Sequence, residues 1–202
     1  MCPCGGTQPR EGWKNVRVLM LGNSLSSANK MPERLGSLLG ADVIAHTRGG
    51  ARLAEQLNPA TSLGARTAAA LKGGGIDVVV LQEASTHPIR CRAAYVRSAC
   101  ALADAARAAG AVPVIFATWA LWDGAKPLVR LGLTRGQMAD ALADAFAEAS
   151  RRGGAPVADV LSSFMRDADP RTLYATDGVH PSERGSLLAA EAIAAAIEAM
   201  DG

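Results

Sequence analysis

Aromatic residues are scarce in this chain: phenylalanine, tryptophan and tyrosine together make up 4% of its 202 residues. A surface that stacks on nucleic-acid bases needs aromatic side chains interleaved with basic ones, and no such stripe occurs here. The formal net charge of +2 is also too close to neutral for the electrostatic footprint of a nucleic-acid-binding protein. We therefore expect no nucleic-acid partner. The hydrophobic content of 49% still allows a normal core, filled mainly by Ala, Leu and Val.

Long hydrophobic runs and recognisable cysteine patterns are missing as well. The longest apolar stretches fall far short of the roughly 20 residues of a membrane span. Residues 1–6 lack the charged and then apolar segments of a signal peptide. The spacing of the four cysteines matches no zinc site; they are Cys2, Cys4, Cys91 and Cys100. We expect a cytoplasmic protein with no membrane partner and no metal, whose residues 1–15 form a disordered tail.

Short apolar runs alternate with Ala-rich or amphipathic stretches along the rest of the chain. Strands are expected at residues 17–21, 42–47, 77–81, 112–117 and 156–160. Helices are expected at residues 32–39, 51–57, 64–71, 91–109, 134–152 and 182–200, with residues 118–133 as a loop. This alternation predicts a single three-layer α/β/α domain over residues 16–202, with a five-stranded parallel sheet in the flavodoxin-like order. Ligands bind such sheets beyond the carboxyl ends of the strands.

The turn after the first expected strand contains Gly22-Asn23-Ser24. Gly22 permits a tight turn, and Asn23 tolerates unusual backbone angles and can form local hydrogen bonds. The free N–H groups at the start of the following helix favour developing negative charge, so Ser24 can act as both nucleophile and oxyanion donor. Since Gly-x-Ser is common, the alternative is that Ser24 only caps the helix.

The last loop holds Asp177 and His180, and the chain has only three histidines. Pro181 keeps His180 out of helical backbone angles. Asp177 can reach the imidazole Nδ1 and fix the tautomer that accepts a serine proton, or it can simply cap the loop beside a surface histidine. The rival bases His46, within the second strand, and His87, in the third loop, have no aspartate in this relation.

Together, the two segments resemble the SGNH (GDSL-type) hydrolase superfamily. That family carries its nucleophile in a Gly-Asp-Ser block near the N-terminus and its acid and base in an Asp-x-x-His block near the C-terminus. The corresponding segments here are Gly22-Asn23-Ser24 and Asp177-Gly178-Val179-His180, with Asn23 in place of the family's Asp. The resemblance implies a nucleophile at Ser24, a base at His180 and an orienting carboxylate at Asp177.

The resemblance also implies an oxyanion hole. Its donors would be the backbone N–H groups of Ser24 and Gly50, with Gly49 as the second choice for the glycine, and a side-chain amide after the third strand. The family's usual Gly-x-Asn-Asp is replaced here by Leu81-Gln82-Glu83. Gln82 offers the same amide on a longer arm, similar to the Gln-Gly-Glu of sialate-type carbohydrate acetylesterases.

Further residues near the expected site are candidates for binding substrate. They are Asn23, Glu83, His87, Trp119 and Trp122. A tryptophan face packs well on a sugar ring, but both tryptophans could instead cover the edge of the core. Glu83 could equally be a solvated or ion-paired loop acid.

These features predict a serine esterase that needs no cofactor and acts on a small-molecule ester. The expected substrates are small acyl esters, above all acetyl esters, of carbohydrates or small metabolites, because the chain is too short for a large lid or a long acyl tunnel. The alternative is a non-catalytic flavodoxin-like module that binds a small molecule or a phosphate in the same cleft. Against it, the turn at Ser24 is not a glycine-rich cradle. The sequence leaves the oligomeric state and the natural substrate open.

Overall fold

The structure is a computed structural model that describes residues 16–201. Five parallel strands form one sheet in the order β2-β1-β3-β4-β5. Their bounds are Arg17–Gly22 for β1, Asp42–Thr47 for β2, Val78–Leu81 for β3, Val112–Phe116 for β4 and Val157–Ala158 for β5. The predicted parallel sheet and its flavodoxin-like order are confirmed. The expected tail at residues 1–15, with Cys2 and Cys4, lies outside the described residues.

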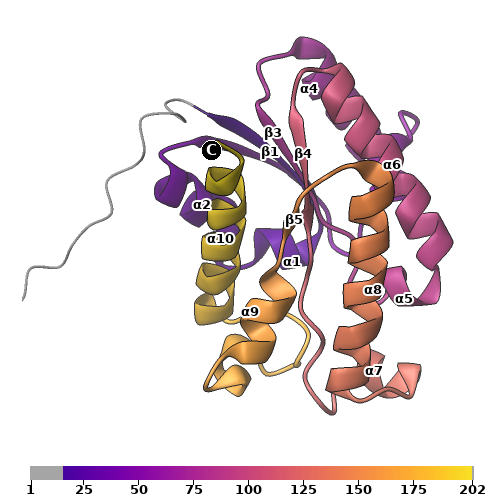
Figure 1. Ribbon diagram of the computed structural model, residues 1–202, viewed down its shortest axis with the longest axis vertical. Coiled ribbons are helices and arrows are strands. Elements are labelled where there is room, and N and C mark those ends of the chain that lie inside the picture. Colours follow the sequence, from indigo (N-terminus) through magenta and orange to yellow (C-terminus); the bar gives the residue numbers. More distant parts are fainter. Residues whose placement is uncertain (1–15, 202) are drawn as a thin grey trace, which may run out of the picture.

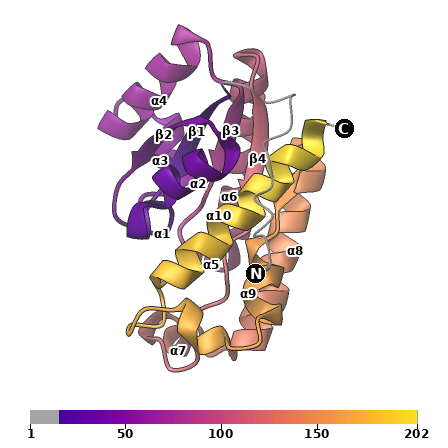
Figure 2. The same cartoon turned by 90° about the vertical axis from the view of Figure 1, so that its left-hand side faces the viewer.

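Helices cover both faces of the sheet (Figure 1). One face carries α2 (Met31–Leu39), α9 (Val160–Arg166) and α10 (Glu183–Glu198). The other carries α3 (Leu53–Leu57), α4 (Ser62–Gly73), α6 (Arg92–Ala108) and α8 (Arg135–Gly153). The short helices are α1 (Ser24–Ser27), η2 (Ala28–Lys30), α5 (His87–Arg90), α7 (Lys126–Leu131), η3 (Pro170–Leu173) and η4 (Ala199–Asp201). In the turned view, α10 crosses in front of the sheet and α2 lies on the same side (Figure 2).

The strands send alternate side chains into two hydrophobic cores. In β1, Leu19 and Leu21 pack on the side of α6 and α8, whereas Val18 and Met20 pack on the side of α2 and α10. All four side chains of β3 are buried, which is typical of a central strand covered on both faces. The site residues that follow these strands are therefore attached to rigid supports.

Two local differences from the expected elements appear near β4 and β5. The segment 118–133, expected as a loop, contains the short helix α7. The fifth strand ends at Ala158 and not at residue 160, because the Asp159 side chain accepts the backbone N–H of Ser162 and so starts α9. An aspartate directly after a short apolar run is itself a helix-start signal.

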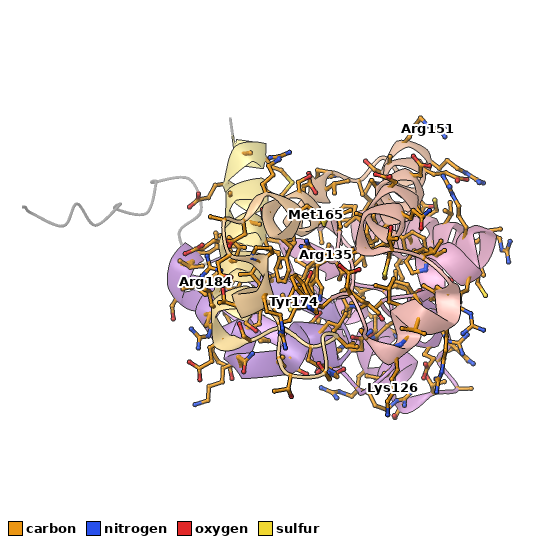
Figure 3. All side chains as sticks on the ribbon, turned by 90° about the horizontal axis from the view of Figure 1, so that it is seen from below. Lys126, Arg135, Arg151, Met165, Tyr174 and Arg184 are labelled. Carbon is orange, nitrogen blue, oxygen red and sulfur yellow. The ribbon has the colours of Figure 1, made fainter. Side chains whose placement is uncertain are left out.

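The loops at the carboxyl ends of the strands gather on one side of the molecule. They lead from β1 to α1, from β2 to α3, from β3 to α5 and from β4 to α7, and the loop between η3 and α10 joins them. Figure 3 shows the molecule from below, the side on which α7 lies in Figure 1, with Arg135 and Tyr174 next to each other near its centre.

Candidate active site

Ser24 is the first residue of α1, directly beyond the carboxyl end of β1. Asn23 caps this short helix: its side-chain oxygen accepts the backbone N–H of Leu25 at 3.0 Å. Gly22 leaves no room for a side chain, since a Cβ there would lie 2.5 Å from both Gln82 Oε1 and Ser26 Oγ. The sharp turn from strand to helix depends on this glycine. The turn leaves Ser24 half-buried at the carboxyl end of β1.

The structure brings Ser24, His180 and Asp177 together. Ser24 Oγ lies 3.0 Å from His180 Nε2, and His180 Nδ1 lies 2.6 Å from Asp177 Oδ2. The second carboxylate oxygen, Oδ1, accepts the backbone N–H groups of Val179 and His180 at 2.9 and 3.0 Å. A carboxylate at Nδ1 keeps the proton on that nitrogen, so the lone pair of Nε2 faces the serine hydroxyl.

The carboxylate of Asp177 is stabilised in its ionised form. Burial raises the pKa of Asp177, but hydrogen bonds from the His180 ring and from two backbone N–H groups outweigh burial and hold the pKa below its usual range. Asp177 is therefore ionised at neutral pH. It can stabilise the imidazolium that forms when His180 accepts a proton.

Residues that follow β4 hold the loop that carries His180. The Trp119 indole Nε1 donates to the carbonyl oxygen of Val179 at 3.0 Å, and the backbone N–H of Trp122 donates to the carbonyl oxygen of Gly178 at 2.9 Å. Gly178 has a φ of 67°, and a Cβ there would lie 3.0 Å from Cβ of Trp122. These contacts fix the imidazole relative to the end of β4.

The two tryptophans occupy different environments. Trp119 is 1% exposed, and its ring stacks on Phe164 with the centroids 4.5 Å apart. This burial corrects the expectation that Trp119 contacts substrate, because its ring is enclosed by the core. Trp122 is half-buried, and the Arg135 guanidinium lies 5.3 Å from the centroid of its ring. Trp122 therefore keeps an open part that a substrate could meet.

The carboxamide of Gln82 is engaged inside the protein. Its Oε1 accepts the backbone N–H of Asn23 at 2.8 Å and the hydroxyl of Ser26 at 2.9 Å, while its Nε2 donates to the carbonyl oxygen of Glu83. The residue has no exposed surface. In this position Gln82 shapes the turn around Ser24, whereas the expected contact with an ester oxygen would require its amide to face the site.

The loop with Gly50 lies against the nucleophile turn. Asn23, which is also buried, donates from Nδ2 to the carbonyl oxygen of Ala51 at 3.1 Å, so its side chain ties the two segments together and does not face a substrate. Within residues 16–201, the backbone N–H groups of Ser24 and Gly50 donate to no protein acceptor. Both are therefore available to a ligand.

Glu83 and His87 lie next to the end of that loop, where the Glu83 carboxylate accepts the backbone N–H of Leu53. The Glu83 carboxylate is 1% exposed, and His87 Nδ1 is 3.4 Å from its Oε2. Burial raises the pKa of Glu83 to about 7, and burial lowers the pKa of His87. The Glu83 side chain is thus enclosed by protein, which corrects its expected role as a substrate contact or solvated acid, and His87 is only slightly exposed.

The third histidine, His46, lies in β2 and is buried. His46 Nδ1 is 3.3 Å from Thr67 Oγ1, and burial lowers the pKa of His46, as expected of a structural histidine in a strand. Across residues 16–201, no three His, Cys, Asp or Glu side chains are grouped to hold a metal ion. No helix in this part of the chain combines the length and apolar character needed to cross a bilayer.

Sequence reasoning missed one residue that joins the two ends of the chain. Asn29 Nδ2 donates to the carbonyl oxygen of Pro181 and to Ser186 Oγ, both at 2.9 Å. The bond fixes the segment after Ser24 to the residue that follows His180. Its only local signal is the left-handed φ of 52° at Asn29, which no sequence pattern reveals.

The comparisons with known proteins agree with this arrangement. The model of the GDSL-like lipase/acylhydrolase family matches residues 11–188. A solved structure from Slackia heliotrinireducens, assigned to the SGNH hydrolases, is 49% identical with a TM-score of 0.88, and the match covers 91% of this chain and 100% of that one. The comparison with curated proteins gives no match.

Two more distant structures share the fold. The psychrotrophic esterase EstA from Pseudoalteromonas sp. is 15% identical with a TM-score of 0.65, covering 92% of this chain and 98% of that one. The lipase/acylhydrolase from Enterococcus faecalis is 14% identical with a TM-score of 0.65, covering 92% and 96%.

Proposed function

Because the chain belongs to the GDSL-like lipase/acylhydrolase family and is an ester-hydrolysing enzyme, we propose that Ser24, His180 and Asp177 are its catalytic triad. The observation that carries the proposal is the continuous hydrogen-bonded path from Ser24 Oγ through the imidazole to Asp177. A helix-capping serine would not need a histidine 156 residues away at 3.0 Å.

The geometry supports hydrolysis in two stages, acylation of Ser24 and then deacylation. His180 Nε2 accepts the Ser24 proton as Oγ attacks the ester carbonyl carbon, and the carbonyl π electrons move to the oxygen. When the tetrahedral intermediate collapses, the C–O bond to the alcohol breaks and the imidazolium gives that alcohol its proton. His180 then deprotonates a water molecule, which attacks the acyl carbon; the bond from that carbon to Ser24 Oγ breaks, the imidazolium returns its proton to Oγ, and the acid leaves.

The oxyanion is stabilised by the backbone N–H groups of Ser24 and Gly50. Both lack an acceptor within the described residues, and the Asn23–Ala51 bond holds their two segments together. Preorganised donors of this kind lower the barrier because they do not reorganise during the reaction. The buried carboxamide of Gln82 favours a positioning role over that of a third donor.

The proposed substrates are small acyl esters, with acetyl esters of carbohydrates or small metabolites first. Two features support this class: the resemblance of Gln82-Glu83 to the acetylesterase block, and the half-buried Trp122 next to the loop that carries His180. Comparing kcat/KM for p-nitrophenyl acetate, butyrate and octanoate, and for acetylated sugars, tests it. A preference for octanoate would overturn the small-acyl assignment.

A fluorophosphonate probe tests the triad directly, since only an activated serine reacts with it. EstA is described as inhibited by monoethylphosphonate, a reagent of related chemistry. We expect labelling of the wild-type protein and none of Ser24→Ala. The matched control is Ser27→Ala, an exposed serine in the same short helix, which should label normally. Absence of labelling in the wild type would favour a non-catalytic module that binds a small molecule or phosphate in this cleft.

A further inference from the structure

Glu83 is a buried acid that the proposed mechanism does not use. It follows Gln82 at the carboxyl end of β3, and its side chain is 1% exposed. A carboxylate in such a place is costly unless it is hydrogen-bonded. Its Oε1 accepts the backbone N–H of Ala84 at 2.7 Å, and its Oε2 accepts the backbone N–H of Leu53 at 3.3 Å.

The bond with Leu53 connects the end of β3 to the loop of the oxyanion hole. Leu53 begins α3, directly after the loop of residues 48–52 that contains Gly50. The same loop is also bound by Asn23, which donates to the carbonyl oxygen of Ala51. Two buried side chains, one from the nucleophile turn and one from the end of β3, therefore hold the residues that directly follow Gly50.

Two buried polar atoms near Glu83 have no hydrogen-bond partner within the described residues: His87 Nδ1 and Tyr95 Oη. His87 Nδ1 is 3.4 Å from Glu83 Oε2, and the Glu83 charge is one cause, after burial, of the raised pKa of Tyr95. Buried polar groups are normally satisfied, so an imidazole nitrogen beside a carboxyl group calls for one shared proton. Either a carboxyl O–H donates to Nδ1, or an Nδ1–H donates to the carboxylate.

We propose that Glu83 is a positioning residue for the oxyanion hole, and that the proton it shares with His87 sets how firmly the Gly50 loop is held. The inference rests on the proposed esterase function. In the ionised form, both oxygens of Glu83 accept backbone N–H groups. When a proton from solvent is added to Oε2, the neutral His87 ring carries its own proton on Nε2, Oε2–H donates to Nδ1, and the bond between Oε2 and the Leu53 N–H weakens. Only O–H and N–H bonds change.

The charged and titratable groups around Glu83 place this change near neutral pH. They are Arg52 from the loop before α3, Glu55 from α3, His87 from α5 and Tyr95 from α6. Burial raises the pKa of Glu83 to about 7 and dominates; the Ala84 and Leu53 N–H groups and Arg52 lower it, and Glu55 raises it. Burial, and then Arg52, lower the pKa of His87.

Activity and stability should therefore respond to pH in opposite directions. Since the pKa of Glu83 is higher in the folded protein than in the unfolded chain, its stabilising contribution is complete below the ordinary carboxyl range and is lost as pH rises through about 7. The ionised form holds the Gly50 loop more firmly, so catalysis should improve over the same interval.

The first test is the pH dependence of kcat and KM for p-nitrophenyl acetate from about pH 5 to about pH 9. His180 must be neutral to accept a proton, which contributes one protonation step. The wild type should depart from a single-proton curve because the Glu83–His87 pair contributes a second. Glu83→Gln, which mimics the protonated form, should follow a single-proton curve, with KM nearly unchanged and kcat at high pH lowered by up to about 10²-fold.

The matched control is Asp104→Asn, which removes one negative charge from the exposed surface of α6 and should keep the wild-type profile. An unchanged kcat in Glu83→Gln, or a profile that keeps the second step, would overturn the proposal. If Glu83→Gln fails to fold, His87→Ala keeps the carboxyl group and should move the second step. A His87→Ala profile that superimposes on the wild type would then contradict the shared proton.

A second measurement does not depend on esterase activity. The free energy of unfolding, measured against pH in the Ser24→Ala background, should fall between about pH 5 and about pH 8 in the chain with Glu83 relative to the Glu83→Gln variant, because only the former contains the Glu83 carboxyl group. If the wild type hydrolyses no ester, the proposed function fails, and this comparison still decides whether Glu83 titrates inside the fold. Identical pH dependences of the free energy of unfolding in the two variants would overturn the shared proton itself.

Discussion

Replacing Gln82 with methionine isolates the role of its carboxamide. Methionine keeps the length of the side chain but removes its polar atoms. The change would leave three buried groups without their partner: the N–H of Asn23, the hydroxyl of Ser26 and the carbonyl oxygen of Glu83. Because Gln82 has no exposed surface, water cannot reach these groups without opening the turn.

The expected loss of stability is large. A buried polar group left unsatisfied costs about 1–3 kcal/mol, so three such groups imply a destabilisation of at least about 3 kcal/mol. Single domains are stable by only about 5–15 kcal/mol, so Gln82→Met should be folded but clearly weakened. The turn that carries Ser24 depends on the same bonds, so kcat should fall together with stability.

Urea unfolding followed by circular dichroism gives the free energy of unfolding, and esterase assays on the folded variant give kcat. The matched control is Gln137→Met, an exposed glutamine in the first turn of α8 whose side chain accepts one backbone N–H. Losing that capping bond should cost about 1 kcal/mol. The difference between the two variants measures the effect of burial.

One result would refute this reasoning. If Gln82→Met stayed within about 1 kcal/mol of the wild type while kcat fell by about 10²–10³, the carboxamide would have to bind the oxyanion directly. Gln82 would then be the third donor that its sequence position suggests, and its contacts with Asn23 and Ser26 would be exchanged for the substrate during turnover.

Three further predictions concern the triad and its support. Ser24→Ala should abolish turnover of p-nitrophenyl acetate without changing the circular dichroism spectrum. If the variant turned over this ester at the wild-type rate, Ser24 would be ruled out as the nucleophile. Asp177→Asn should lower kcat by on the order of 10⁴, because the tautomer of His180 is no longer fixed. Because the pKa of Asp177 is lowered in the folded protein, its contribution to the free energy of unfolding is present above the ordinary carboxyl range and is lost as pH falls through that lowered pKa. The free energy of unfolding from urea denaturation should therefore change less at acidic pH in Asp177→Asn than in the wild type. Trp119→Phe removes the donor to Val179 at a cost of about 1 kcal/mol and should reduce kcat with KM unchanged; a normal kcat would show that the loop is held without it.

The parts of the site that could be predicted from sequence are those set by short-range geometry. Asp177 and His180 are three residues apart, so their contact needs only a turn, and Ser24 follows a strand whose end fixes its location. Right-handed crossovers between parallel strands leave only a few strand orders, and the flavodoxin-like order is the common one among them. None of these inferences depends on which residues pack around the site.

The direction of a side chain after a strand could not be predicted in the same way. Gln82 turns inward because Asn23 and Ser26, more than 50 residues earlier, supply its donors. Trp119 is enclosed because Phe164 stacks on it and Val179 accepts its N–H. Such partners come from distant segments, and the sequence near an amide or an indole does not name them.

The bonds between Asn29 and the segment after His180 bear on how the enzyme is made. A growing polypeptide exposes Ser24 early, but Asp177 and His180 emerge only after all five strands, and α10 must then dock beside α2. With the proposed triad, a nascent chain cannot hydrolyse esters until its last loop closes. The same order makes loss of esterase activity a sensitive indicator of proteolysis. A cut before Asp177 that releases the final segment removes Asp177, His180 and α10 together.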